Sequence, residues 1–580
     1  MTTDVIAQRA TVPPATVPPR PVPEWGPPDP APAPPGGAWP SPVPRALLVA
    51  LVTLAGLVGL GIRLWFTFHS PSSADEAVVG ILARSGLHGH VQAFYAGQQY
   101  GGTAEPYLIA AAFAVFGPSV VVGRLVLVVL AAVAALLVWR ITLRIVGIRS
   151  VALLAGALAW SAPAITARDS VRMYGFRGVA LLCGLVALLL SLRIADGRRG
   201  RPEFAGLGVA LGLGWWSTPE ILYVSVPVLA LLVLGFVRTP SGERRRWGVA
   251  TGVAVVAFAV GALPWIWSNA RSRLGSFATG EFTDHRPYVG YAGRLGLFFQ
   301  HVLPMDLGLD RMDGGHRFFG VDNALVELVF LSVLVAAVAL CIRRGGSALA
   351  LAAGVVAFPF VYALSPAAWA WTDGRYSYFL PPLLAVVLAV GATEAVQRVG
   401  LGRAAASWLM AVALVVSAVL AVVDTRAVVS AQRTGFVATW GDPDAATLRV
   451  VPELEAAGIR TAYADYWVAY KLDFLSGGGL TVTTAGWDTD RSAADDAVVD
   501  ASRRPAWLFV PMREARVDGT QFTSPSTTVT VDKVDERQFE GRLRRLGVPY
   551  RVLDFGILQA VVPARTVDQF AAGVPGASSP

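Results

Sequence analysis

The stretch ALLVALVTLAGLVGLGIRLWFTFHSPSSADEAVVG, residues 46–80, decides the class of fold. Residues 46–67 are almost continuously apolar, and about 20 such residues are enough for a helix to cross a bilayer. Two adjacent carboxylates, Asp75 and Glu76, follow a few residues later. Adjacent carboxylates at a bilayer surface belong either to an ordinary solvated loop or to an active site that faces the lipid.

The rest of the chain repeats the apolar pattern. Hydrophobic residues make up 54% of the 580 residues and charged residues only 15%, and the mean hydropathy is +0.54, which identifies an integral membrane protein. We expect about eleven transmembrane helices, at 46–67, 119–138, 150–167, 176–194, 203–219, 221–237, 247–267, 323–342, 346–366, 376–395 and 404–423. The two short segments on either side of Pro219 are also consistent with one broken or re-entrant hairpin.

Arginine placement predicts the orientation, because basic residues in short loops stay on the cytoplasmic side. If the first helix runs outward, every second connection is rich in arginine, from Arg140 in the first to Arg403 in the last. The N-terminus is then cytoplasmic, and Asp75 and Glu76 lie on the extracytoplasmic face of a cell membrane. The net charge of +8 is explained by these topogenic arginines and gives no reason to expect a nucleic acid partner.

Composition divides the chain into four parts. Residues 1–45 are rich in proline and predict a disordered cytoplasmic tail, and residues 46–425 form the membrane domain. Residues 426–564 alternate helical patterns with strand-like runs, which predicts an extracytoplasmic α/β domain, and 565–580 form a flexible tail. Because this α/β domain lies outside the membrane, we expect it to help recognise the acceptor.

Three clusters of polar residues are expected on the outer face. The first outer loop offers Tyr100, Glu105 and Tyr107 as substrate-binding candidates, since hydroxyl and carboxyl groups bind sugars. Interfacial tyrosines are common, however, and anchoring at the headgroups is the competing interpretation.

The second cluster is ARDSVRMYGFR, residues 167–177. If it is helical, Arg168 and Arg172 share a face, and Asp169 could orient Arg172 and leave Arg168 free to bind a phosphate. Tyr174 is a further substrate-binding candidate. The alternative is that these arginines only reach to the outer headgroups.

The third cluster is TDGRYSYFLPPL, residues 372–383, where Asp373, Arg375 and Tyr376 precede another apolar run. Carboxylates and arginines at an outer membrane surface, without a nucleotide-binding motif, suit the transfer of a sugar from a lipid phosphate. A carboxylate would take the proton of the acceptor hydroxyl, and arginines would stabilise the departing phosphate.

These motifs and their order resemble the GT-C superfamily, in particular bacterial relatives of the protein O-mannosyltransferase and lipid A aminoarabinose transferase group. The resemblance covers about residues 46–425 and implies a polyprenyl-phosphate sugar donor, an inverting displacement and no obligatory metal. It implies that Asp75 is the general base with Glu76 in support, and that Arg168, Arg172 and Arg375 bind the donor phosphate. The chain has fewer spans than many members and lacks lysines in the membrane domain.

We expect no cofactor and no metal, because His88 and His90 lack further ligands at a recognisable spacing. The acceptor would be a cell-envelope glycan, a glycolipid or a protein, and membrane lipids surround the chain. The alternative function is a polytopic transporter or flippase of a lipid or glycan. The chain has no internal repeat that would favour it. A third interpretation is a noncatalytic scaffold, which leaves the carboxylates and outward arginines unexplained.

Overall fold

The computed structural model describes residues 43–95, 97–277, 289–310, 317–318, 321–322, 324–365, 368, 374–432, 443–485, 491–510 and 536–567. Within these residues, seven helices are long and apolar enough to cross a membrane. They are α1 (Arg45–His69), α4 (Val120–Val146), α7 (Arg177–Ala195), η1 with α9 (Pro219–Val224 and Ser225–Val237), α15 (Ala324–Arg344), α17 (Leu380–Arg398) and α18 (Arg403–Gln432).

The remaining predicted segments are also helical but are shorter or bent. Helices α10 (Arg244–Gly261) and α11 (Leu263–Arg271) meet at an angle of 64° and would make an eighth span if counted together. Helices α5 (Arg149–Trp160), α8 (Arg201–Ser217) and α16 (Gly346–Tyr362) are shorter than the roughly 20 residues that a membrane-spanning helix needs. The prediction of a polytopic helical membrane protein is therefore confirmed, whereas the count of eleven spans stays a prediction.

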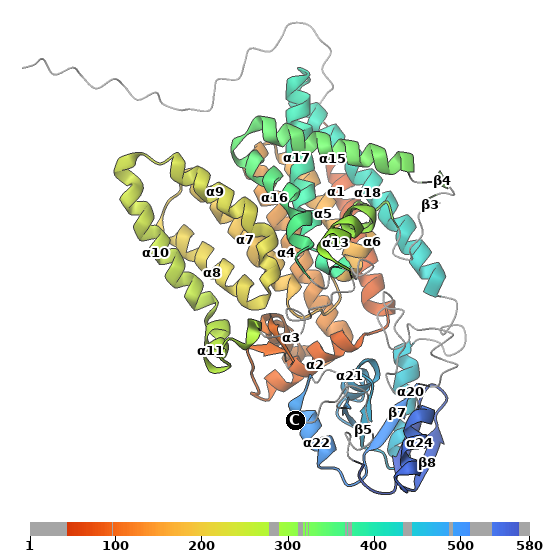
Figure 1. The fold of residues 1–580 in the computed structure, drawn as a ribbon. Helices are drawn as coiled ribbons and strands as arrows, with labels where there is room; N and C mark the ends of the chain where they lie inside the picture. The colour runs from red at the N-terminus through yellow and green to blue at the C-terminus, as the bar shows by residue number, and fades with distance from the viewer. Residues whose placement is uncertain are drawn as a thin grey trace, which may run out of the picture. The chain divides into compact units, whose positions relative to one another are not determined.

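Helix α8 packs as a separate element between α7 and α10 (Figure 1). Glycines make this approach close: a Cβ on Gly208 would lie 2.1 Å from the carbonyl oxygen of Ala254, and one on Gly212 would lie 2.2 Å from that of Phe258. Small residues spaced by four positions let helix backbones pack tightly in a membrane. These contacts account for a short, glycine-rich helix at this position.

Two helices and a hairpin follow α1 at one end of the bundle, which we call the site end. They are α2 (Ala74–Leu87), β1 (Phe94–Tyr95), β2 (Gln98–Gly102) and α3 (Ala104–Phe116). Helix α2 begins with a capping box, in which the Ser73 hydroxyl accepts from the Glu76 N–H and the Glu76 carboxylate accepts from the Ser73 N–H. This box places the carboxylate pair in the first turn of α2.

The predicted basic connections meet at the opposite end of the bundle. Arg144 in the last turn of α4 forms an ion pair with Asp196 after α7, with 2.8 Å between Nε and Oδ2. Arg344 at the end of α15 donates to the Ile145 carbonyl oxygen at 3.0 Å. Three of the arginine-rich connections are therefore neighbours in space.

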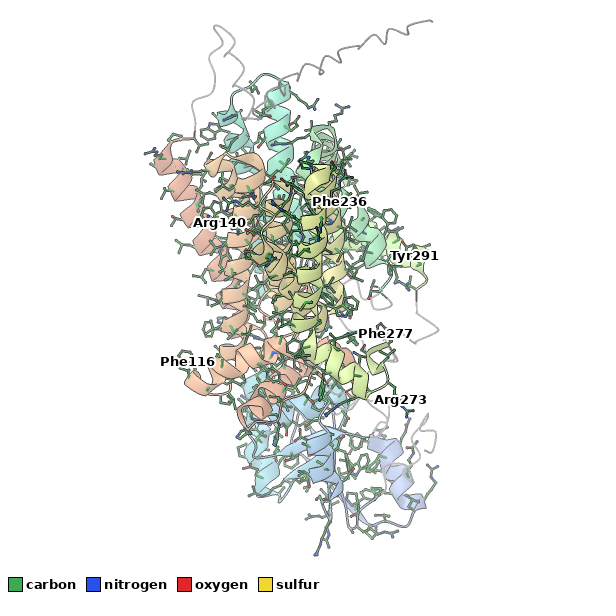
Figure 2. The ribbon with its side chains drawn as sticks, turned by 90° about the vertical axis from the view of Figure 1, so that its left-hand side faces the viewer. Phe116, Arg140, Phe236, Arg273, Phe277 and Tyr291 are labelled. Carbon is green, nitrogen blue, oxygen red and sulfur yellow. The ribbon has the colours of Figure 1, made fainter. Side chains whose placement is uncertain are left out.

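Figure 2 shows residues from both ends of the helical bundle. Arg140 and Phe236 lie toward one end of the bundle, and Phe116, Arg273 and Phe277 lie toward the other. The chain therefore passes from end to end as predicted. Which end faces the cytoplasm stays a prediction.

The C-terminal part confirms the predicted α/β domain. Its five-stranded sheet has the order β6-β5-β7-β9-β8, in which β5, β6 and β7 are parallel and β9 is antiparallel to β7 and β8. The elements are α20 (Pro443–Ala456), β5 (Thr461–Ala464), α21 (Tyr466–Leu475), β6 (Thr481–Thr484), α22 (Ala493–Asp500), β7 (Ala506–Phe509), α24 (Glu536–Arg545), β8 (Tyr550–Asp554) and β9 (Gln559–Pro563). Helices between the parallel strands provide the crossover that such pairing needs.

Short elements connect the longer ones. They are α6 (Ala164–Asp169), η2 (Ser241–Glu243), η3 (Gly275–Phe277), α13 (Tyr291–Leu297), η4 (Phe298–Val302), α14 (Leu303–Asp306), β3 (Arg317–Phe318), β4 (Val321–Asp322) and η6 (Gly374–Tyr376). Two of them, α6 and η6, carry predicted site residues.

Candidate active site

Asp75 lies where three distant parts of the chain meet. It stands in the first turn of α2, and its Oδ2 accepts from Arg375 Nη1 of η6 at 2.9 Å. Its Oδ1 accepts from the Tyr466 hydroxyl, which comes from α21 of the C-terminal domain, at 2.7 Å. The Asp75 and Arg375 side chains are 24% and 18% exposed. This ion pair, which we call the pocket pair, can therefore be reached from solvent.

Glu76 faces the opposite way and is fully buried. Arg124 of α4 binds both its carboxylate oxygens, at 2.8 and 2.7 Å, and the Met173 N–H adds a third bond at 3.3 Å. Burial alone would raise the pKa of Glu76, but the Arg124 charge and its hydrogen bonds hold that pKa below the usual value. We call this ion pair the buried pair. Glu76 is therefore closed to solvent, with its carboxylate bonded inside the protein.

Arg124 also fixes the connection between α1 and α2. Its Nη1 donates to the carbonyl oxygens of Thr67 at 3.1 Å and Ser70 at 2.7 Å, and its Nη2 donates to that of Pro71 at 3.1 Å. A buried helix end needs partners for its last carbonyl groups, and Arg124 supplies them. The buried pair therefore fixes the point at which α2 begins, and it thereby fixes the position of Asp75.

The segment after α6 differs from the sequence expectation. Asp169 was expected to orient Arg172, but Arg168 Nε donates to Asp169 Oδ1 at 2.8 Å instead. The expectation assumed one helix across both arginines, whereas α6 ends at Asp169 and Ser170 caps it. Arg172 consequently lies on a turn, where it is only 3% exposed and its Nε and Nη1 have no hydrogen-bond partner among the described residues.

Two small pockets adjoin Asp75 and Arg172. The first, about 50 Å³, is lined by Asp75, Val78, Val79, Tyr95, Gln98, Tyr100, Tyr174, Phe176, Arg177, Arg375, Tyr376 and Tyr466. The second, about 10 Å³, is lined by Glu105, Leu127, Leu130, Asp169, Ser170, Arg172, Tyr174, Arg177, Gly178, Arg375 and Tyr378. Because Arg375 lines both, it connects the carboxylate with the buried guanidinium of Arg172.

The predicted tyrosines have different positions. Tyr100, Tyr174 and Tyr376 line the pocket beside Asp75. The Tyr107 hydroxyl instead donates to the Gln92 carbonyl oxygen at 2.7 Å, which ties α3 to the preceding loop. The structure therefore does not bring Tyr107 to the pocket.

Asp373, Arg168 and Asp169 complete the predicted set. Asp373 lies outside the described residues. Arg168 does not line either pocket, whereas Asp169 lines the one that contains Arg172.

Glu105 holds the loop that carries Arg172 and Tyr174. Its carboxylate accepts from the N–H groups of Gly175 at 3.0 Å and Gly178 at 2.9 Å. Burial raises the pKa of Glu105 to about 7. Gly175 has a φ of +81°, and a Cβ there would lie 1.5 Å from the Tyr95 hydroxyl, so this turn requires glycine. Glu105 is thus better placed to shape the pocket wall than to bind substrate.

Sequence reasoning missed Arg177 and Tyr466. Arg177 lines both pockets and donates to the two carboxylate oxygens of Glu220 at 2.8 and 2.5 Å. Its guanidinium carbon also lies 4.8 Å from the centre of the Tyr376 ring. Arg177 is the last residue of the motif at 167–177, so that motif could have indicated it. No local pattern links Tyr466 with Asp75.

An apolar groove lies on the membrane part near these pockets. Its volume is about 480 Å³, and residues of α5, α14, α15, α17 and α18 line it, including Asp306 at the end of α14. Asp306 accepts from the Ser377 hydroxyl at 3.1 Å, two residues from Arg375. Burial raises the pKa of Asp306 well above its usual range.

The predicted absence of a metal centre rests on the histidines and acids of the sequence. His88 and His90 are exposed, and His88 Nδ1 lies 2.9 Å from the Arg84 carbonyl oxygen. In the described part of the chain, no group of three or more His, Cys, Asp or Glu side chains is arranged to hold a metal ion.

Comparison with known proteins gives one family match and a set of similar folds. Residues 103–267 match the family model described as dolichyl-phosphate-mannose-protein mannosyltransferase. No curated protein sequence matches the chain. The crystal structure of ArnT from Cupriavidus metallidurans bound to undecaprenyl phosphate is 14% identical, with a TM-score of 0.55, over 90% of this chain and 98% of that one. The apo structure of the same protein gives 13% identity and a TM-score of 0.55 over 89% of this chain and 98% of that one.

The family match over residues 103–267 and the shared fold both support the resemblance to the GT-C membrane glycosyltransferases. The resemblance stated from the motifs is therefore confirmed, as is the multi-pass membrane architecture. Within that class, the matched family model covers the segment from α3 to α11, which contains Arg172 and Arg177.

Proposed function

We propose that the protein transfers a sugar from a polyprenyl-phosphate donor to a cell-envelope acceptor on the extracytoplasmic face. The observation that supports this proposal is that a carboxylate and a buried arginine lie at one site. A carboxylate that solvent can reach, Asp75, shares Arg375 with a pocket whose wall contains the buried, incompletely bonded guanidinium of Arg172. An incompletely satisfied buried cation is costly unless an anion completes it, and a phosphate suits a guanidinium fork.

The proposed reaction is a direct displacement with inversion. Asp75 accepts the proton of the acceptor hydroxyl while that oxygen forms a bond with the anomeric carbon. The bond from the anomeric carbon to the phosphate oxygen breaks, and the polyprenyl phosphate leaves with one more negative charge. Arg172 and Arg375 stabilise that charge. No phosphate loop is needed, because the sugar arrives already activated.

In this scheme, Arg375 pairs either with Asp75 or with the donor phosphate. Without donor it neutralises Asp75 at 2.9 Å. A donor phosphate in the pocket of Arg172 competes for the same guanidinium, because Arg375 lines that pocket as well. Donor binding would therefore loosen Arg375 from Asp75 and free an oxygen to accept the acceptor proton. Both pockets are small, about 50 and 10 Å³, so such a shift is also required to admit a sugar phosphate.

The apolar groove suits the prenyl chain of the donor. Membrane-spanning helices line it, and its end at Asp306 lies next to η6, which carries Arg375. Burial favours the neutral form of the Asp306 carboxyl, which lessens its repulsion of a phosphate. ArnT, which shares the fold, has been solved with undecaprenyl phosphate bound, and a lipid of this kind is the donor carrier we infer.

The testing experiment measures transfer of radiolabelled sugar from polyprenyl-phosphate mannose, and in parallel arabinose, into membranes that contain the protein. Asp75→Asn keeps the shape of the side chain but removes the base, so transfer should fall by at least about a hundredfold. Asp554→Asn, an exposed carboxylate in β8, is the matched control and should transfer like the wild type.

The outcomes separate the alternatives. Equal transfer by Asp75→Asn and the wild type would remove Asp75 from catalysis. Wild-type protein that moves the labelled lipid across vesicles but transfers no sugar would support a lipid or glycan transporter instead.

A further inference from the structure

The C-terminal domain is joined to α2 along the length of α21. A Cβ on Gly80 would lie 2.5 Å from the Phe474 ring, so the helices touch where α2 has no side chain. Toward the end of α2, Arg84 Nη2 donates to Asp473 Oδ2 at 2.8 Å, and the Asp473 side chain is only 2% exposed. Close packing and an ion pair that is largely removed from water therefore fix one end of this contact.

A second polar contact fixes the other end. The Ser72 N–H, just before α2, donates to Asp444 Oδ2 at 2.9 Å, and Lys471 Nζ lies 2.7 Å from Asp444 Oδ1. Burial alone would raise the pKa of Asp444, but the Lys471 charge holds that pKa below its usual value. Asp444 therefore stays ionised and bridges the start of α2 to α21.

Tyr466, the first residue of α21, contacts Asp75, which lies between Ser72 and Arg84 along the chain. Its hydroxyl donates to Asp75 Oδ1 at 2.7 Å, on the oxygen that Arg375 does not bind. Burial, and then the Asp75 charge, raise the pKa of Tyr466 well above its usual value. The phenol therefore stays protonated and remains a donor to the carboxylate at any physiological pH.

Tyr466 is itself held in place by its own domain. The Arg491 guanidinium carbon lies 5.8 Å from the centre of the Tyr466 ring, and the Arg491 N–H donates to the Tyr470 hydroxyl one turn further along α21. The Tyr466 and Tyr470 rings meet edge to face, with centres 5.3 Å apart. The phenol is thus preorganised by groups that all belong to the C-terminal domain.

We propose that Tyr466 is a positioning residue for Asp75, so that the C-terminal domain completes the active site as well as lying beside it. This inference rests on the proposed function. Each carboxylate oxygen has two lone pairs, and the Tyr466 bond uses one on Oδ1. By fixing the plane of the carboxylate, the phenol directs the remaining lone pairs into the pocket. This matters most once a donor phosphate has drawn Arg375 away, because among the described residues the Tyr466 hydroxyl is then the donor left to orient the base.

The test compares Tyr466→Phe with the wild type for transfer from radiolabelled polyprenyl-phosphate mannose. We expect kcat to fall about tenfold or more, with the donor KM changed less than about twofold, because the lost bond goes to a charged group. The acid limb of the pH–rate profile should move to higher pH, since the ionised carboxylate loses a donor that favours it. Tyr463→Phe, which loses a tyrosine bond from β5 to Asp500 of α22 within the C-terminal domain, is the matched control.

A second variant separates positioning from docking. Arg84→Ala removes the ion pair with Asp473 but leaves Asp75 and Tyr466 in contact, so it should retain transfer within about twofold and keep the wild-type pH profile. Unchanged kcat and pH profile in Tyr466→Phe would overturn the inference. So would Arg84→Ala losing as much as Tyr466→Phe with the same shift in pH profile, because docking alone would then explain both. Failure of the proposed function looks different, since Asp75→Asn would then transfer normally.

Discussion

Asp75 and Glu76 are neighbours in α2, and each pairs with an arginine from a distant part of the chain, but their surroundings are opposite. In the buried pair, Glu76 and Arg124 are 0% and 2% exposed. In the pocket pair, Asp75 and Arg375 are 24% and 18% exposed. The buried pair holds its partners through several hydrogen bonds on each side, whereas the pocket pair has room for a change of partner.

The difference shows that two neighbouring residues in one helical turn can have different roles, one structural and the other chemical. A fully satisfied buried ion pair cannot exchange partners without leaving a charge unpaired in a medium of low dielectric constant. An ion pair at a pocket can give up one contact to water or to a ligand at small cost. Adjacent carboxylates therefore divide the work: Glu76 fixes the start of α2, and we infer that Asp75 accepts the proton.

The largest expected effect comes from breaking the buried pair. Arg124→Met should destabilise the protein by about 3–5 kcal/mol, because Glu76 is left charged, buried and unpaired. Thermal unfolding in detergent measures this loss. Arg375→Met is the control and should change stability by less than about 1 kcal/mol while it abolishes most transfer. A melting curve for Arg124→Met that matches the wild type would mean that the buried pair is not structural.

A smaller effect is expected at Arg172. This guanidinium is buried like that of Arg124, but in the part of the chain that the structure describes its Nε and Nη1 have no partner, so Arg172→Met should not lower the thermal stability of the protein without ligand. It should weaken binding of undecaprenyl phosphate about 10- to 100-fold, because bonds to a charged group are lost. A thermal-shift titration with that lipid measures the change.

The matched control for this prediction is Arg271→Met. Arg271 is an exposed arginine at the end of α11, stacked on Trp267 with 4.3 Å to the ring centre. We expect it to bind the lipid as the wild type does. Equal weakening by Arg172→Met and Arg271→Met would mean that the lipid responds only to overall charge.

The membrane architecture could be predicted from sequence because it depends on local properties. An apolar run long enough to cross a bilayer must form a helix, since its backbone groups have no other partners there. The alternation of basic loops likewise depends only on neighbouring residues. The same reasoning found Asp75, because it directly follows the first span.

Contacts between distant segments could not be predicted in this way. Arg124 lies within an apolar run and carries no local signal that its partner is Glu76, and Tyr466 is separated from Asp75 by 391 positions. The predicted arrangement around Asp169, in which it orients Arg172, was wrong for a different reason. Spacing implied a continuous helix, but α6 stops at Asp169, so Arg172 lies on a turn instead of on one helical face with Arg168. Helix ends are set by tertiary packing, which spacing alone does not reveal.

The smallest effect is expected in the apolar groove, which neither ion pair contacts. Val412 of α18 lines this groove and is 60% exposed within the protein. If the groove holds the prenyl chain, Val412→Trp would displace about 40 Å² of apolar contact, or roughly 1 kcal/mol, and raise the donor KM about fivefold. Val129→Trp on α4, at 61% exposure and outside the groove, is the control. Since we infer that the pocket pair holds only the headgroup, kcat should stay unchanged, and a donor with only two isoprene units should not distinguish the variants. A fall in kcat with an unchanged donor KM would instead mean that the groove influences the chemistry at Asp75 and that the chain binds elsewhere.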